Sequence, residues 1–525
     1  MAPVKRLEPE QVKRADEKPK RKKVAFVKDT GIDANECVSV YLVSSLEEMQ
    51  DAKKLEDQGL SFNPEYMEQF VGEDGKIYGY KGLKIDVWLN SLSFHAYADI
   101  QYENKIEDSK SEKRTTDLKD LMKKIFGQGL MEDRDAFIQS LSSNSHHIES
   151  LIHNVGEIIE TCEIHTDKTL TVQGDSGILG TVTSEEIIHL ELADPGVKEW
   201  HSRLVPLVLL LVEGSQPIEQ DDTKWEMYIA IQRELLNEGD TRHKLLGFCI
   251  VYRFYHYPDS TRLRISQILV FPPYQGKGHG LHILEAVNKI AVQRDSYDVT
   301  VEEPSLSLQE LRDCMDTLRL LSFHQVRCAI KPVVERLKQA KVSDNTTLDH
   351  SLEGNGKGES SFALKTNSKS RSWWFPSPEL VEEVRKHLKI NKKQFKRCWE
   401  TLVFLNLDQS DSQCQESYQI LLMEQIMSEL FDNSSEKIAN GKRVIDIGDD
   451  HDSSNSFMMI RTKGSNAGTD GSVLPVPMED GNGVESREDQ LKAVFEERLE
   501  EITHVADKVS RHCKPLGIQV PIVSP

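Results

Sequence analysis

The clearest pattern of apolar and polar positions lies between residues 265 and 320. Residues 265–271 form an apolar run that predicts a buried strand, and Pro272 and Pro273 end it. After a glycine-rich segment, apolar residues recur at the spacing of one helix face, from Leu281 to Ala291. Residues 297–301 predict a second strand, and residues 306–320 a second helix. The pattern therefore indicates a β-α-β unit followed by a helix.

Upstream of this unit, strand and helix signals mix without a regular βαβ rhythm. Residues 38–44, 77–89 and 93–102 predict strands, and residues 118–126 and 135–141 predict helices. We expect an independent α+β domain over residues 35–185. A helix over 199–212 and strands over 225–232 and 245–255 complete a second domain, residues 186–335. The fold class expected is α/β (α+β), with a mixed sheet in the second domain.

The two ends of the chain differ in character from these domains. Residues 1–34 carry basic clusters such as Lys20-Arg21-Lys22-Lys23 and few apolar residues, which predicts a disordered tail. The tail is either a nuclear import signal or a solvated segment. Polar stretches at 336–373 and 433–487 predict a flexible insertion and a disordered linker. Apolar periodicity returns over 374–432 and 488–514, predicting a helical C-terminal domain and a terminal helix.

Net charge and the distribution of cysteines argue against several classes of function. The 525-residue chain has a net charge of −21. This charge repels nucleic acid and would attract a very basic partner; the alternative is that it serves only solubility. Eight cysteines are scattered without a C-x-x-C pair, which argues against a zinc site and against a disulfide framework. No apolar run approaches the 18 residues expected of a membrane span. We expect no metal, no direct nucleic-acid partner and no membrane association.

The glycine-rich segment has the chemistry of a pyrophosphate site. Gln275, Gly278 and Gly280 satisfy the Gln/Arg-x-x-Gly-x-Gly/Ala pattern of acetyl-CoA-binding loops. The glycines admit a phosphate close to the backbone, and N–H groups at the helix N-terminus point at it. The spacing of Gly276, Gly278 and Gly280 does not fit a Rossmann fingerprint, and Gly276-Lys277 is not followed by Ser or Thr as in a P-loop. A purely structural loop is the alternative.

The β-α-β unit resembles the acyl-CoA-binding half of the GCN5-related N-acetyltransferase fold. The closer resemblance, over roughly residues 35–335, is to the type B histone acetyltransferase catalytic subunits. It rests on residues 252–264, on Ser266-Gln267, on the Phe-Pro-Pro-Tyr-Gln-Gly-Lys-Gly-His-Gly run, on Val-Glu-Glu-Pro-Ser, and on residues 72–85. The family implies acetyl-CoA as co-substrate and lysines in the tail of free histone H4, with its histone partner, as acceptors. It also implies a WD40 β-propeller histone chaperone as partner, in the nucleus and cytoplasm.

Three carboxylates are candidates for catalysis. A free lysine has a pKa of about 10.4, so a base must deprotonate it at neutral pH. Glu302 matches the family's base, and we expect it to be partly desolvated. Glu303 adds a second carboxylate where the family often has Asp, and the two can share one site only if the strand ends or bends there. Glu213 matches a supporting carboxylate. Ordinary exposed acidic residues are the alternative for all three.

The cofactor and tail contacts follow from the resemblance. Backbone groups of Ile268, Leu269 and Val270 are expected to pair with the pantetheine arm. The pyrophosphate contacts expected are Gln275, Gly276, Lys277, Gly278, His279, Gly280 and Leu281, although His279 could be only a loop residue. The tail contacts expected are Glu73, Asp74, Gly75, Trp225, Tyr252, Arg253 and Phe254. A buried core position is the alternative for Trp225.

The preferred function is therefore a histone acetyltransferase that acts by direct attack of the lysine, with Glu302 as general base. Acetylation of small amines or of protein N-termini is a second enzymatic possibility. A CoA-sensing histone chaperone or scaffold without activity is a third. An intact Glu302 argues against the last of these, but a carboxylate in a sequence does not establish a working base.

Overall fold

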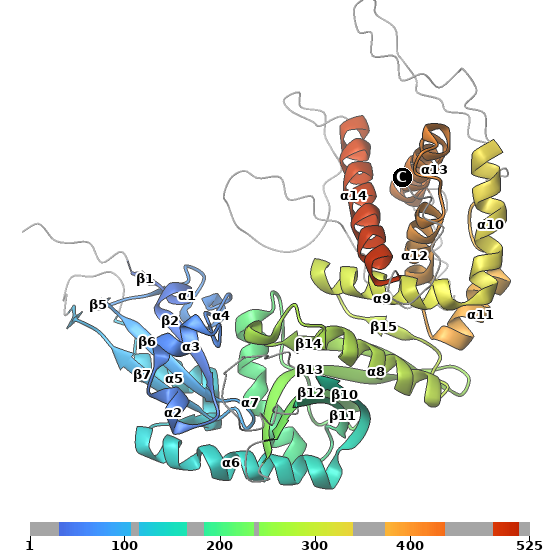
Figure 1. The fold of residues 1–525 in the computed structure, drawn as a ribbon. Coiled ribbons are helices and arrows are strands. Elements are labelled where there is room, and N and C mark those ends of the chain that lie inside the picture. The colour runs from blue at the N-terminus through green and yellow to red at the C-terminus, as the bar shows by residue number, and fades with distance from the viewer. Residues whose placement is uncertain are drawn as a thin grey trace, which may run out of the picture.

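The computed structural model describes residues 31–106, 115–164, 183–235, 241–339, 373–435 and 487–513. Most of the basic tail, of the insertion at 336–373 and of the linker at 433–487 lies outside the described residues. Within them the chain forms an N-terminal part, a central part and a helical C-terminal part (Figure 1).

The central part is built on a six-stranded sheet with strand order β10-β11-β12-β13-β14-β15. Neighbouring strands are antiparallel except for β14 and β15, which run parallel. The strands are β10 (Glu157–Ile164), β11 (Thr183–Glu191), β12 (Trp225–Leu235), β13 (Thr241–His256), β14 (Ser260–Val270) and β15 (Val299–Val301). This is the mixed sheet expected from the sequence.

The N-terminal part holds a five-stranded sheet of order β3-β2-β6-β7-β9 and two short strand pairs, β1 with β4 and β5 with β8. The strands are β1 (Ile32–Asp33), β2 (Val38–Val43), β3 (Ser61–Phe62), β4 (Lys76–Ile77), β5 (Tyr80–Lys81), β6 (Lys84–Asn90), β7 (Ala96–Gln101), β8 (Asn104–Lys105) and β9 (Leu130–Met131). The single strand expected over 77–89 is wrong. Gly79 and Gly82 adopt positive φ and divide it into three.

Two long helices, α6 and α7, contact both the N-terminal part and the central part. The helices of these parts are α1 (Ala34–Cys37), α2 (Leu46–Met49), α3 (Ala52–Asp57), α4 (Glu68–Val71), α5 (Leu118–Phe126), α6 (Arg134–Val155), α7 (Pro195–Leu211) and α8 (His279–Gln293), with 3₁₀ turns η1 (Gly127–Gly129) and η2 (Pro272–Tyr274). Helix α6 contacts β7 and β9 of one sheet and β11 of the other (Figure 1). Helix α8 packs on β12, β13 and β14.

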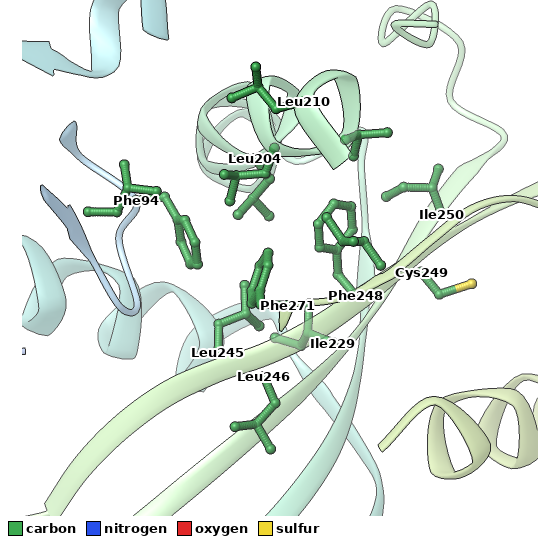
Figure 2. Close-up of a cluster of buried hydrophobic side chains, with 14 of the residues drawn as sticks. Phe94, Leu204, Leu210, Ile229, Leu245, Leu246, Phe248, Cys249, Ile250 and Phe271 are labelled. Atoms are coloured by element: carbon green, nitrogen blue, oxygen red, sulfur yellow. The ribbon is translucent and has the colours of Figure 1, made fainter. Parts of the chain in front are cut away.

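Helix α7 covers the sheet through a core shared by both parts (Figure 2). Phe94, from the loop between β6 and β7, packs against Phe271 with the two ring centroids 4.9 Å apart and the rings tilted, and Phe248 lies beside Phe271. The same loop accepts hydrogen bonds from α7: Trp200 Nε1 donates to Leu92 O (2.9 Å), and Arg203 Nε donates to Ser93 O (2.8 Å). The N-terminal part is therefore held against the central sheet by apolar contacts and by fixed polar contacts.

The C-terminal part is a helical bundle with its own core. Its helices are α9 (Leu306–Ser322), α10 (His324–Gln339), α11 (Pro378–Leu388), α12 (Lys392–Leu405), α13 (Ser412–Ser435) and α14 (Arg487–Cys513). It joins the sheet edge at β15, where Val299 N–H donates to Lys389 O (2.9 Å) and Ile390 bridges to Val299. None of the described helices is long and apolar enough to span a bilayer.

Helix α7 places a titratable residue, His201, in the buried core, and we therefore expect the free energy of unfolding to depend on pH. His201 is fully buried, and burial lowers its pKa to about 4. Gln220 Nε2 lies 2.8 Å from its Nδ1, an arrangement that suits a neutral ring. The unfolded chain binds a proton near pH 6.5 and the folded chain does not until about pH 4. Stability contributed by this site is therefore lost as the pH falls below 6.5.

We expect the free energy of unfolding to fall by about 2 kcal/mol between pH 6.5 and 5 on account of His201. Denaturant titrations at the two pH values measure the loss, and His201→Gln should reduce it because glutamine does not titrate. An equal loss in the variant and in the unmodified chain would contradict this assignment.

Candidate active site

β14 loses its neighbour on one side partway along its length. β15 pairs with β14 only at Leu263, Arg264 and Ile265, whereas β14 continues to Val270. On its other side β14 remains paired with β13 as far as Val270. Among the described strands, residues 268–270 therefore have a partner on one side only, and their other edge is open.

The backbone groups on this open edge can be identified. Phe271 N–H donates to Leu246 O of β13 (3.0 Å), so residue 271 faces β13. Alternate residues face opposite sides, which turns the backbone of Ile268 and Val270 to the open edge and that of Leu269 to β13. Consistent with this, Val270 O accepts from Gln275 Nε2 (2.9 Å). Of the three residues expected to pair with a cofactor arm, two present backbone groups.

The glycine segment opens onto the N-terminus of α8. Gly278 is the N-cap, in the left-handed region at φ 96°, and no side chain caps the helix there. The first N–H groups of a helix, here those of His279, Gly280 and Leu281, have no partner within the helix. Gly276 has φ 74° and no atom within 4 Å of an added Cβ. A Cβ on Gly280 would lie 3.3 Å from Leu311. The arrangement suits a bound phosphate.

Two side chains of the segment do not face such a ligand. Lys277 Nζ donates to Pro273 O (3.0 Å) within the loop. His279 is buried, and its Nδ1 lies 2.9 Å from Glu185 Oε1 on β11; His282 Nδ1 lies 2.8 Å from the other carboxylate oxygen. Burial raises the pKa of the Glu185 carboxyl, but the two imidazoles outweigh it and hold the pKa at about 2. Only the backbone of His279 is available to the loop.

Glu302 lies at the point where β15 ends. Its N–H donates to Ile265 O (2.9 Å), and its Oε2 accepts from Ser266 Oγ (2.8 Å). Ser266 is the extra residue of a bulge in the β13–β14 pairing. Both the backbone and the carboxylate of Glu302 are thus held by β14. The side chain is exposed, so the partial desolvation expected for it is not found in the chain alone.

The other two candidate carboxylates lie near this strand end. Glu303 follows directly in the left-handed region (φ 38°), and its side chain is exposed, so the chain does bend after β15 as a shared site requires. Glu213 is exposed in the loop after α7. That loop is fixed to β14, because Gln267 Nε2 donates to Gln216 O (2.8 Å). The loop of Glu213 therefore lies against the residue next to Ser266.

Three predicted tail-binding aromatics form a row across β12 and β13. Trp225 is paired with Tyr252, with ring centroids 4.6 Å apart, and Tyr252 contacts Phe254 at 4.5 Å. Trp225 is half-buried, which excludes a fully buried core position. Tyr252 donates to Asp222 Oδ2 (2.6 Å), and this bond raises the pKa of Tyr252 to about 12. The row combines apolar rings with an adjoining carboxylate.

The structure separates Arg253 from this row. Successive side chains of a strand face opposite sides, and Arg253 Nε lies 3.2 Å from the buried carboxylate of Glu226. Its Nη2 also donates to Thr223 O (3.1 Å). Arg253 therefore links β13 to β12 and to the segment that precedes β12.

The acidic turn lies between α4 and β4. Glu73 and Asp74 are exposed, Asp74 Oδ2 accepts from Tyr78 Oη (2.8 Å), and Gly75 is buried at φ 64°. The segment that precedes α4 is attached to the end of α7, because Glu65 N–H and Tyr66 N–H both donate to Leu210 O. The turn and the loop of Glu213 are thus connected to the same helix end.

Two family models match this chain in the regions that hold the site. Residues 30–213 match the family described as the histone acetyl transferase HAT1 N-terminus, and residues 202–310 match the acetyltransferase (GNAT) family. A solved aminoglycoside acetyltransferase from an uncultured soil sample is 19% identical, with a TM-score of 0.18, over 23% of this chain and 79% of that chain. The family matches confirm the acetyltransferase domain and the N-terminal domain expected from the sequence.

Full-length relatives extend the match to nearly the whole chain. The histone acetyltransferase type B catalytic subunit of Arabidopsis thaliana is 37% identical over 95% of this chain and 97% of its own. That of Zea mays is 37% identical over 94% of both chains, and the human one is 26% identical over 71% of this chain and 76% of its own. The chain belongs to the family of histone acetyltransferase type B catalytic subunits and is an enzyme of the acetyltransferase class.

Proposed function

We propose that this enzyme transfers acetyl from acetyl-CoA to lysines in the N-terminal tail of newly made, free histone H4, with Glu302 as general base. The proposal rests on three features that lie near the end of β15. These are the open edge of β14, the uncapped N-terminus of α8 and a carboxylate fixed to β14 by Ser266. Holding a thioester, binding a pyrophosphate and accepting a proton require these three features.

The residues around the loop fit acetyl-CoA, which supplies an activated acetyl thioester when it is bound. Backbone groups of Ile268 and Val270 would hold the pantetheine arm, and Leu269 would support it from the core. N–H groups from Gly276 to Leu281 would hold the pyrophosphate, where Gly276 leaves open space. Lys277 would add positive charge after leaving its contact with Pro273.

Glu302 would accept the proton of the attacking lysine. Its exposed carboxylate can be reached from solvent, and Ser266 fixes its orientation. A bound peptide would cover it and supply the desolvation that the chain alone does not. Glu303 and Glu213 would support it by attracting the lysine ammonium before deprotonation.

The acceptor surface would combine the aromatic row with carboxylates. Trp225, Tyr252 and Phe254 offer apolar rings, while Glu73 and Asp74 lie on an exposed turn. Such a surface suits a flexible basic peptide. The net charge of −21 adds long-range attraction to a histone. Arg253 would contribute indirectly, through its ion pair with Glu226.

The family resemblance extends the proposal to partners and location. We expect the histone partner of H4 to accompany it and a WD40 β-propeller histone chaperone to bind the enzyme, in the nucleus and the cytoplasm. The basic clusters of residues 1–34 would serve import, although most of them lie outside the described residues.

A radiolabel assay tests the proposed function directly. Purified full-length protein is given acetyl-CoA with free histones, nucleosomes or polyamines. Label on free histone H4 at a rate well above that on nucleosomes is expected. Faster labelling of polyamines would support the small-amine alternative. Binding of acetyl-CoA and of histones without any transfer would support the chaperone alternative.

The phosphate site predicts different behaviour for two substitutions at Gly276. Asp and Asn both tolerate the positive φ of this residue, and the structure leaves room for either. Gly276→Asp should weaken acetyl-CoA binding about tenfold or more, because its carboxylate would lie against the pyrophosphate. Gly276→Asn should have a much smaller effect. Calorimetry on both variants measures this, and equal affinities would exclude a phosphate at this loop.

Replacement of Glu302 tests the base. Glu302→Gln keeps the side-chain shape but cannot take up the lysine proton, so kcat should fall by roughly 10²–10⁴. Acetyl-CoA affinity should be retained. Raising the pH should recover part of the rate, because more lysine is then already deprotonated.

Two further variants serve as controls for this experiment. Glu303→Gln should lower kcat less, since that side chain is not held by Ser266. Ser266→Ala should also lower kcat less, because the base remains but loses its fixed orientation. Turnover near that of the unmodified enzyme for Glu302→Gln across pH 6–9, with chemistry rate-limiting, would remove Glu302 from the mechanism.

If the acidic turn contacts the acceptor peptide, its charge should affect the KM for that peptide and not the binding of acetyl-CoA. Glu73→Lys should raise the KM for a histone H4 tail peptide about two- to fivefold at low salt, and the effect should shrink as salt is added. Glu416→Lys makes the same charge change on an exposed residue of α13 and is the matched control. Equal KM values for the two variants would show that the turn does not contact the peptide.

A further inference from the structure

A group of metal-binding side chains lies behind the phosphate loop, between α8 and the edge of the central sheet. Glu185 of β11 and His279 and His282 of α8 bring three donor atoms to within 4.8 Å of one another. Glu185 and His279 are buried, while the His282 side chain is 31% exposed. The group can therefore be reached from solvent through His282.

A fourth donor is placed beside this group by strand pairing. Cys162 of β10 is directly opposite Glu185 in the β10–β11 register. Directly opposed residues project on the same face, with Cβ atoms about 5 Å apart. The Cys162 thiol is half-buried and uncrosslinked. Its sulfur does not lie within the 4.8 Å that encloses the other three donor atoms, so the Cys162 side chain would have to turn toward them on metal binding.

The charge around the group favours a cation. Glu160 of β10 and Glu285, one turn further along α8, interact electrostatically with His282, as Glu185 does. Three carboxylates thus lie close enough to His282 to favour a positive charge at this position. Two imidazoles, a carboxylate and a thiolate form a donor set that Zn²⁺ and Co²⁺ bind in tetrahedral geometry.

We propose that Glu185, His279, His282 and Cys162 form a binding site for a divalent cation of the zinc class. The bound cation would join β10 and β11 to the first turn of α8, directly after the N-cap residue Gly278. It would stabilise the helix end whose N–H groups face the loop. The site is independent of the proposed acetyl-transfer chemistry, since none of its side chains faces the open edge of β14.

Metal titration of the full-length protein tests the site. The protein is stripped with a chelator, dialysed, and titrated with ZnCl₂ by calorimetry and with CoCl₂ by visible absorption. We expect one tight equivalent of either ion, the intense bands of tetrahedral Co²⁺, and a thiolate charge-transfer band. Zn²⁺ should raise the Tm of the stripped protein, because it binds the folded state.

Three variants assign the binding to these residues. His282→Gln should weaken the tight equivalent by at least about tenfold and reduce the Tm shift at a given Zn²⁺ concentration. Cys162→Ser should remove the charge-transfer band. The matched control is His243→Gln, since His243 also contacts a carboxylate, Glu149 Oε1, at 2.8 Å but lies outside the group. The control should bind as the unmodified protein does.

Two results would overturn the proposal. One is the lack of a tight equivalent or of tetrahedral Co²⁺ bands in the unmodified protein. The other is equal Zn²⁺ affinity in His282→Gln and the unmodified protein, which would place the metal elsewhere. The group would then be a hydrogen-bonded brace between β11 and α8. Should His282→Gln fail to fold, the Co²⁺ spectra of the unmodified protein and of Cys162→Ser decide the question.

Discussion

The candidate active site depends on the early end of β15 beside a bulge in β14. Had β15 continued in parallel past Val301, it would have closed the backbone edge of residues 268–270. The bulge supplies an extra residue, Ser266, at that point, and its hydroxyl reaches the Glu302 carboxylate. The early end of β15 opens the edge on which a thioester would lie, and the bulge orients the carboxylate beside it. A regular strand pair would provide neither feature.

The position of the N-terminal part relative to this strand end is set by α7. Its middle residues, Trp200 and Arg203, hold the β6–β7 loop, from which Phe94 enters the shared core (Figure 2). Its last turn accepts the N–H groups that precede α4. The loop that follows is anchored to Gln267. Because α7 and the loop directly after it make all these contacts, the acidic turn and the strand end cannot shift independently without loss of contacts.

The features predicted correctly from the sequence are those that depend on residues close together in the chain. The strand, proline break, glycines and helix between 265 and 320 are all determined by near neighbours, and the predicted elements appear there. The strand over 77–89 failed because apolar periodicity does not register the positive φ of Gly79 and Gly82. Arg253 was grouped with Tyr252 and Phe254 by its place in the motif, although strand alternation and Glu226 direct it elsewhere. Ser266 belonged to a recognised motif, but its hydrogen bond to Glu302 joins residues 36 apart.

The group around Glu185 shows a different limit of sequence reasoning. The scattered cysteines argued against a zinc site, and cysteine spacing does not register the three donors that converge here, which come from β11 and α8. His279 is 94 residues from Glu185. Helix α8 accounts for the convergence, because its first turn lies against β11, where His279 and His282 both contact Glu185. The same placement buries His279 and directs His282 toward β11. A helix end that offers N–H groups to an anion on one side is held on the other by a buried carboxylate, so its position is fixed before any ligand arrives.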